Sequence, residues 1–243
     1  MIDFHCHLDL YPQGILLARE TNERNQFTLV VTTSPRAHRA TSRVFAGLRN
    51  VHVALGLHPE VVEEKRAELD ALIAGVAEAR FVGEIGLDGS PRFRRTLPLQ
   101  ERIFLAALEE CAAQGGRVLS IHSRGAERRV VELLALQPRV GVPVLHWFSG
   151  SVAELQDATS LGCWFSVGPA MLAGAKGRAL LARMPAHRVL PETDGPFTSS
   201  QGQPLKPWDA WKIGPILAQI WDQPLEVVES QLTANLKNLL TQQ

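Results

Sequence analysis

Short aliphatic runs recur along the chain and alternate with longer amphipathic stretches. Several of the runs are solidly apolar and show no alternation of polar and apolar residues, which is typical of strands covered on both faces. Eight such runs predict strands, at residues 2–7, 28–33, 51–57, 81–87, 117–122, 142–146, 163–167 and 188–192.

The stretches between these runs have the period of helices that turn one side towards a core. The clearest is 99–114, in which one stripe is apolar and the remaining positions are largely polar. A capping box, with Ser151 before the helix and Glu154 three residues further on, marks the start of another. Together the patterns predict helices over residues 63–78, 99–114, 126–137, 152–160 and 225–240.

Strand and helix therefore alternate about eight times, which predicts parallel strands joined by helical crossovers. Eight such units in 243 residues, with no Gly/Ser-rich linker, favour an α/β fold of the closed (β/α)8 TIM-type barrel over an open sheet. We expect one barrel domain over residues 1–243. The polar stretch 198–203 is expected to be a loop.

Composition narrows the class of protein. The formal net charge is zero, which argues against coating nucleic acid by charge alone but leaves a local basic pocket open. Three scattered cysteines, Cys6, Cys111 and Cys163, form no Cys-x-x-Cys pair and predict buried thiols in a reducing compartment. The sequence shows no basic-then-apolar leader, and no apolar run approaches the ~20 residues that span a bilayer. We therefore expect a cytoplasmic protein with no membrane contact.

The first predicted strand carries two histidines, His5 and His7, inside an apolar run. Side chains alternate between the faces of a strand, so these two point the same way and Cys6 points the other way. Two imidazoles on one strand make half of a metal site. The alternative is one surface histidine and one hydrogen-bonded core histidine.

Further polar residues interrupt the apolar runs at or near the ends of predicted strands. In a barrel of this type the active site lies at the C-terminal ends of the strands. Each residue alone could be an ordinary core or turn residue, but carboxylates gathered with histidines at one buried rim need a cation to neutralise them. The predicted shared metal site consists of His5, His7, Glu84, His122, His146 and Asp194.

This ligand set also indicates the number and kind of ions. Six donors with a central carboxylate that can bridge suit two divalent ions ~4 Å apart. Imidazole and carboxylate ligands suit Mg²⁺, Mn²⁺ or Zn²⁺, and the sequence does not select among them. Arginines near the expected rim favour an anionic substrate such as a nucleic-acid end, although Arg128 and Arg129 could equally be solvated; they are Arg36, Arg39, Arg92, Arg94, Arg95, Arg124, Arg128 and Arg129.

A resemblance to a known family rests on six short motifs that follow one another along the chain, and on Asn235 with the leucines after it. The chain resembles the TatD family of metal-dependent deoxyribonucleases, within the amidohydrolase-like barrels. The motifs are Asp3-Phe4-His5-Cys6-His7-Leu8-Asp9, Gly56-Leu57-His58-Pro59, Gly83-Glu84-Ile85-Gly86-Leu87-Asp88, Ile121-His122-Ser123-Arg124, His146-Trp147-Phe148-Ser149-Gly150 and Glu192-Thr193-Asp194-Gly195-Pro196.

The resemblance implies a role for each matching residue. His5 and His7 would hold one metal, His122 and His146 the second, and Glu84 would bridge both. Asp194 would bind the first metal and orient the attacking water, so Asp194 and Glu84 are the catalytic residues. His58 and Arg124 would bind the substrate phosphate. The implied activity is a 3′-to-5′ exonuclease on single-stranded DNA that uses a metal-bound water as nucleophile.

Three loops depart from the usual family pattern and leave the substrate preference open. Gly89 and Ser90 stand where aromatic residues are usual, Gly125 where an acidic residue is common, and residues 205–207 replace an Asn-Glu-Pro segment. The opening residues and the compact loops are similar to those of the TatD-like component of the Qat anti-phage defence cluster. That similarity implies an antiviral role and partner proteins encoded alongside.

Three other functions compete with a deoxyribonuclease. Cyclic amidases and phosphotriesterase-like enzymes usually bridge their metals with a carboxylated lysine on strand four, but the strand around Glu84 contains no lysine. Hydrolysis of another ester, such as that of aminoacyl-tRNA, is compatible with the same ligands. A scaffold subunit of a defence complex would not need the complete ligand set.

Overall fold

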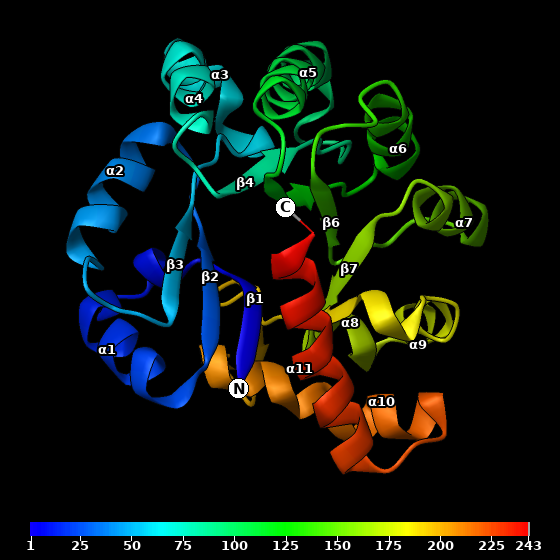
Figure 1. The fold of residues 1–243 in the computed structure, drawn as a ribbon. Helices are drawn as coiled ribbons and strands as arrows, with labels where there is room; N and C mark the ends of the chain where they lie inside the picture. Colours follow the sequence, from blue (N-terminus) through cyan, green and yellow to red (C-terminus); the bar gives the residue numbers. More distant parts are fainter. Residues whose placement is uncertain (243) are drawn as a thin grey trace.

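The parallel strands of the chain stand side by side around a central axis (Figure 1). This computed structural model describes residues 1–242, so Gln243, the last residue of the expected domain, lies outside the described residues. The strands are β1 (Ile2–Cys6), β2 (Phe27–Val31), β3 (Val51–Ala54), β4 (Phe81–Gly86), β5 (Val118–His122), β6 (Val142–His146), β7 (Trp164–Val167) and β8 (Val189–Pro191).

Helices connect successive strands and cover the outside of the barrel, and two more follow β8 (Figure 1). They are α1 (Gly14–Arg24), α2 (Pro35–Val44), α3 (Val62–Lys65), α4 (Leu69–Val76), α5 (Leu97–Gln114), α6 (Glu127–Ala135), α7 (Val152–Ser160), α8 (Pro169–Ala173), α9 (Ala175–Leu181), α10 (Gly214–Trp221) and α11 (Leu225–Thr241).

Two seams close the barrel. β3 is joined to β4 by an isolated parallel pairing of Leu55 with Val82. β8 is joined to β1 by the turn that follows it, in which the Asp194 amide donates to the His5 carbonyl at 2.9 Å. The amide of His7 donates to the Gly195 carbonyl at 2.8 Å. The (β/α)8 barrel expected from the sequence is therefore confirmed, and its seams are made partly by the residues that carry the candidate chemistry.

The predicted strand over residues 51–57 is wrong at its end, because β3 stops at Ala54. Past the end of β3, the residue that follows β2 is hydrogen-bonded to β4: the Glu84 amide donates to the Thr32 carbonyl at 3.2 Å. Gly56 lies against this crossing, where an added Cβ would stand 2.2 Å from the Thr32 oxygen. Only glycine fits there, which explains the glycine before Leu57 and His58.

β1 and β4 each contain an irregular register. The β1–β2 pairing shifts between Asp3 and Cys6, and the β4–β5 pairing shifts between Val82 and Ile85. An extra residue of this kind changes the face to which the following side chains point. In β1 the shift lets Phe4 pack into the apolar cluster at one end of the barrel while His5 faces the other end.

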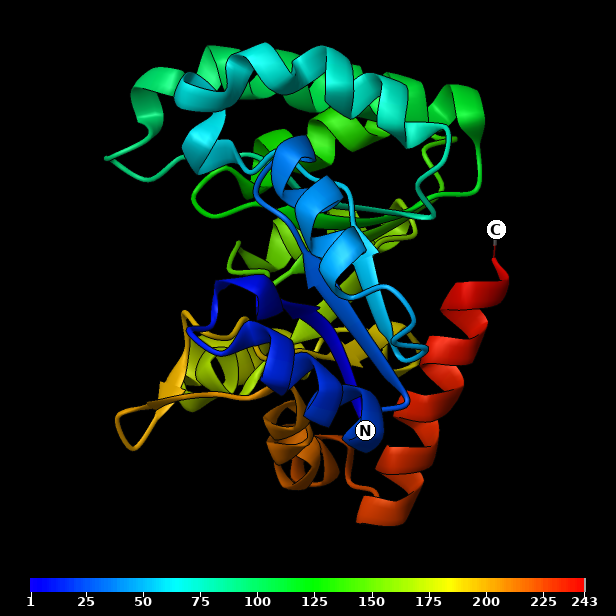
Figure 2. The same cartoon turned by 90° about the vertical axis from the view of Figure 1, so that its left-hand side faces the viewer.

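The starts of the strands form an apolar cluster that α11 closes. Two leucines of α11, Leu236 and Leu239, pack there against large side chains of the strands, which are Ile2, Phe4, Phe27, Phe81 and Trp164. Buried Asn235 ties α11 to β8, because its amide donates to the carbonyls of Ala186 and Val189 at 2.8 Å each. Figure 2 shows α11 and the hairpin of β9 (Ser199–Ser200) and β10 (Gln203–Pro204) on opposite sides of the barrel.

Local predictions had mixed outcomes. The helix over 152–160 is confirmed as α7 with its capping box, since Ser151 Oγ accepts from the Glu154 amide and the Glu154 carboxylate accepts from the Ser151 amide. The predicted helix over 63–78 is broken by a 3-10 turn at Arg66–Glu68. The stretch 198–203 is not a plain loop but contains a short hairpin, β9 (Ser199–Ser200) and β10 (Gln203–Pro204). Within residues 1–242, no helix has the length and apolar character that a bilayer crossing requires.

Candidate metal centre

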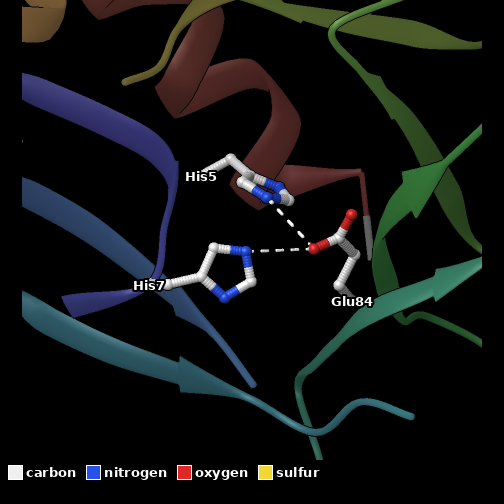
Figure 3. Close-up of side chains that lie close together, drawn as sticks. All are labelled: His5, His7 and Glu84. Atoms are coloured by element: carbon white, nitrogen blue, oxygen red, sulfur yellow. Dashed lines mark ion pairs between the residues drawn. The ribbon is translucent and has the colours of Figure 1, made fainter. Parts of the chain in front are cut away.

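The side chain of Glu84, on β4, is the centre of a histidine cluster, and the residue is only 1% exposed. Its Oε2 lies 3.4 Å from His5 Nε2 and 3.2 Å from His7 Nε2 (Figure 3). The same oxygen lies 3.3 Å from His58 Nε2, and Oε1 lies 2.8 Å from His122 Nδ1. Four imidazoles from three separate segments of the barrel therefore meet one buried carboxylate.

Local structure fixes the direction of these rings. His58 precedes the 3-10 turn Pro59–Val61, and its Nδ1 accepts the Glu60 amide at 3.1 Å, which leaves Nε2 facing Glu84. His5 is held by Ser120 of β5, whose hydroxyl lies 2.8 Å from His5 Nδ1. In both cases one ring nitrogen is occupied by the protein and the other is directed into the cluster.

His146 and Asp194 complete the group. The ring of His146 stacks on that of His5, with centroids 3.7 Å apart and planes at 10°. Asp194 Oδ1 lies 3.8 Å from both His5 Nε2 and His7 Nε2. Asp194 has φ of +55°, in the left-handed region that aspartate adopts more readily than most residues. The structure thus places all six residues of the predicted metal site in one cluster.

Several buried polar atoms in this cluster have no hydrogen-bond partner among the described residues. Leaving such atoms unpaired costs free energy, so each calls for a ligand or another explanation. A divalent cation at Glu84 would satisfy His5 Nε2 and Glu84 Oε2, and imidazole nitrogens with carboxylate oxygens are suitable donors for Mg²⁺, Mn²⁺ or Zn²⁺. The atoms are His5 Nε2, His7 Nδ1, Glu84 Oε2 and Glu192 Oε1.

The donor atoms also approach one another closely enough to share ions. Among the described residues, three groups of three side chains each have donor atoms that lie within 4.8 Å of one another inside the group. Glu84 belongs to two of these groups. The residues present therefore fit a metal centre that includes more than one set of donors. The groups are His5 with His7 and Glu84, His5 with His146 and Glu192, and His58 with Glu84 and His122.

The stacked histidines have opposite pKa shifts. Burial, together with the positive charge of His146, lowers the pKa of His5 to about 4. Burial also lowers the pKa of His146, but the adjacent Glu192 carboxylate outweighs it and raises the pKa to about 10. At pH 7 His5 is therefore neutral, which is the form that ligates a metal, whereas His146 holds a proton that a bound metal would have to displace.

The two candidate catalytic carboxylates also differ. Burial alone would raise the pKa of Glu84, but His58 and His5 outweigh it and hold the pKa well below its ordinary value. Burial raises the pKa of Asp194 to about 6, against the opposing effects of His146 and His7. Glu84 is thus the carboxylate held more strongly in its charged form, whereas Asp194 protonates more readily.

Several residues that position the cluster had no assigned role in the sequence-based prediction. Asp88 Oδ2 lies 2.9 Å from His122 Nε2, and Glu192 Oε2 lies 3.0 Å from His146 Nδ1. Carboxylates that bind the second nitrogen of a ligand histidine fix its orientation. A signal for Ser120 was available, because it stands two residues before His122 and therefore on the same face of β5.

Two cavities open onto the cluster. The smaller is about 210 Å³ and is bounded by His58, Glu84, Arg124 and Phe197, among others. The larger is about 400 Å³ and includes Arg124 and Trp147 in its wall. Both predicted substrate residues, His58 and Arg124, therefore line the site, and Arg124 borders both cavities.

Other arginines of the predicted rim lie elsewhere. Arg129 pairs with Glu101 at 2.8 Å and with Glu132 at 3.1 Å on the surface. Arg39 lines a separate groove next to Phe45 and Gly47. Of the arginines named from the sequence, Arg124 is the one that lines the two cavities at the cluster.

A (β/α)8 barrel with a histidine–carboxylate cluster at the C-terminal ends of its strands defines the class of metal-dependent hydrolases with an amidohydrolase-like fold. Within that class, residues 2–241 match the family model described as TatD related DNase, and the chain belongs to this family.

Three comparisons place the chain within the family. It is 28% identical to the uncharacterized metal-dependent hydrolase YjjV of Escherichia coli, over 98% of this chain and 96% of that protein. The crystal structure of YjjV superposes with a TM-score of 0.84, covering 99% of this chain and 97% of that one. The 3′-5′ ssDNA/RNA exonuclease TatD of Edwardsiella piscicida is 35% identical over 58% of this chain and 56% of its own length.

Proposed function

We propose that this protein is a divalent-metal-dependent phosphodiesterase that removes nucleotides from the 3′ end of single-stranded DNA. The observation that carries the proposal is the buried Glu84 carboxylate, whose Oε2 faces three imidazoles and has no hydrogen-bond partner within residues 1–242. Membership of the TatD related DNase family supports the nuclease class. The name of the Edwardsiella piscicida relative supports the polarity and the single-stranded substrate.

The assignment implied by the family resemblance divides the cluster into two sets of donors around Glu84. In this proposal His5, His7 and Asp194 would hold one ion, His122 and His146 would hold a second, and Glu84 would serve both. Bound divalent ions would neutralise the phosphate charge and lower the pKa of a water molecule towards ~7. Mg²⁺, Mn²⁺ and Zn²⁺ all suit these donors.

The remaining steps belong to side chains of the chain itself. Asp194 lines both cavities and is placed to accept the proton of the attacking water. Arg124 can donate two parallel hydrogen bonds to phosphate oxygens, a pairing that its guanidinium geometry favours. His58, in the wall of the smaller cavity, is placed to donate to the phosphate from Nε2.

A nuclease assay tests the proposal. Single-stranded DNA, single-stranded RNA and duplex DNA, each labelled at the 5′ end, are incubated with the purified protein and with Mg²⁺, Mn²⁺, Zn²⁺ or EDTA. We expect a ladder of products shortened from the 3′ end of the single-stranded DNA, and no products in EDTA. Arg129→Ala is the control and should behave as wild type, because Arg129 lies outside both cavities.

The same assay includes an aminoacyl-tRNA ester as a competing substrate. If no nucleic acid is shortened with any metal and the ester is hydrolysed, the exonuclease proposal is wrong, although the metal site stands. This outcome would reassign the cluster to the other ester chemistry that its donors allow.

Three expectations from the sequence remain predictions. They are a single domain over residues 1–243, a cytoplasmic location, and work in anti-phage defence with partner proteins. The last is tested by purifying the tagged protein from its own host during phage infection. Recovery of proteins encoded next to it would support the defence role, and recovery of the chain alone would contradict it.

A further inference from the structure

Phe197 is an exposed aromatic residue at the mouth of the candidate site. Its side chain is 66% exposed, yet it lines the smaller cavity together with His58 and Arg124. The ring meets that of His7 edge to face, with centroids 5.0 Å apart and planes at 80°. One part of the ring thus contacts a metal-site histidine, and much of the remainder is open to solvent.

The backbone around Phe197 is firmly held. The amide of Phe197 donates to the Asp194 carbonyl at 3.0 Å. The next residue, Thr198, is buried and donates from its hydroxyl to the Thr193 carbonyl at 2.6 Å. The amide of Leu205 then donates to the Thr198 carbonyl at 3.0 Å. The exposure of the ring is therefore a property of an ordered segment.

The position of this ring matches a need of the proposed substrate. When the phosphate of a nucleotide is bound at Arg124 and His58, the base of that nucleotide lies outside the polar cluster. Exposed aromatic rings beside a cationic site are the usual stacking surfaces for unpaired bases. Gly89 and Ser90, in the loop after β4, offer no such ring. Phe197 supplies an exposed one directly at the cavity mouth.

We propose that Phe197 is a stacking platform for the base of the nucleotide adjacent to the scissile phosphate. This inference rests on the proposed function and names the chemical class of the bound group, an unpaired nucleobase. It also gives a reason for selecting single strands, because the terminal base of a duplex is already stacked and paired. Phe197 then determines substrate affinity and takes no part in the bond-breaking step.

A binding measurement tests the platform without turnover. The ligand is a single-stranded oligonucleotide with 2-aminopurine as its 3′-terminal base and phosphorothioate linkages that slow hydrolysis. Stacking quenches 2-aminopurine, so the wild-type protein and Phe197→Trp should quench it in the presence of Mn²⁺. Phe197→Ala should not, and Phe197→Leu, which keeps apolar bulk without a ring, should behave like the alanine variant. The length of the oligonucleotide is checked afterwards on a gel.

The matched control is Leu136→Ala. Leu136 is 65% exposed, close to the value for Phe197, but it lies at the end of α6 and does not line either cavity. The Leu136→Ala variant should quench the 2-aminopurine fluorescence as the wild type does. Mn²⁺ affinity is measured for every variant, and an unchanged value for Phe197→Ala separates lost stacking from a disturbed His7.

Steady-state rates give the second readout. Loss of one stacked base corresponds to roughly 5- to 150-fold in affinity. Phe197→Ala should therefore raise KM by that factor while kcat stays within about threefold. With an oligonucleotide that lacks the terminal base, wild type and Phe197→Ala should have the same KM. Equal quenching and equal KM for wild type and Phe197→Ala on the normal substrate would overturn the inference.

The outcomes separate this inference from the proposed function. Quenching that depends on Phe197, with no cleavage under any condition, would support the platform and reject the exonuclease. Cleavage that does not depend on Phe197 would do the reverse. Neither binding nor cleavage by the wild type would reject both.

Discussion

The two ends of the barrel are built by the same strands and have opposite character. At the strand starts, Phe4 of β1 and Phe81 of β4 pack into an apolar cluster that α11 covers. At the strand ends, His5 of β1 and Glu84 of β4 lie in a buried polar cluster with unpaired donor atoms. The first arrangement stabilises the fold by burial. The second costs stability and creates a site.

The register shifts in β1 and β4 occur between these two ends. Regular alternation would send Phe4 and His5 to opposite faces of β1. The extra residue lets both face the interior of the barrel at different heights. We therefore expect mutations at the apolar end to lower stability without changing activity. Mutations at the polar end should lower activity with little change in stability.

The largest expected effect is that of Glu84→Gln at the polar end. The amide cannot supply two anionic oxygens, so we expect a loss of activity of at least roughly 10³-fold with every metal. The unfolding temperature in EDTA should change little, which circular dichroism would measure. Activity near the wild-type value would show that Glu84 does not anchor the site.

The converse effect is expected for Leu239→Ala at the apolar end. Leu239 is fully buried in the cluster under the barrel, so the substitution should lower the free energy of unfolding by about 2–5 kcal/mol. kcat per folded molecule should be unchanged. Leu136→Ala, at an exposed position, is the control and should cost less than about 0.5 kcal/mol. A specific loss of kcat in the Leu239 variant would mean that the two ends are coupled.

A smaller effect is expected for Glu192→Gln, which acts on the site through His146. Removing the charge that faces His146 Nδ1 should weaken Mn²⁺ binding by about 10–100-fold, as measured by titration calorimetry. Glu132→Gln removes an exposed carboxylate and should leave Mn²⁺ affinity unchanged. Equal affinities for the two variants would leave Glu192 without a positioning role.

The smallest effect is expected for Arg129→Ala. Its ion pairs with Glu101 and Glu132 are exposed, and such pairs contribute about 0–1 kcal/mol. Neither KM nor kcat should change. An increase in KM that shrinks at high salt would instead place Arg129 in the path of the nucleic acid.

The sequence was sufficient for the alternation of elements and for selecting six histidines and carboxylates that the structure brings together, because such residues stand out at the ends of apolar runs. It was not sufficient for details set by distant contacts. The pairing of His146 with Glu192 joins the end of β6 to the residue that follows β8, and nothing local indicates which ring nitrogen is held. The register shifts in β1 and β4 were equally hidden. In β1, residues 2–6 alternate between apolar and polar as in a regular strand, so nothing marks the extra residue, and β4 shows no alternation that a shift would interrupt.

The hairpin at residues 199–204 and the exposure of Phe197 were hidden for a similar reason. Both depend on bonds to the turn after β8, such as that from Leu205 to Thr198. A short polar stretch carries no period from which such pairing can be read. The place of Phe197 at the cavity mouth is set by the folded turn after β8.

The most direct test of the account is anomalous scattering from crystals grown with Mn²⁺. We predict two anomalous peaks that share Glu84, one in contact with His5 and His7 and the other with His122 and His146, and no peaks there in Glu84→Gln crystals. A wild-type crystal with no peak at Glu84, although Mn²⁺ binds elsewhere in the protein, would contradict the central claim.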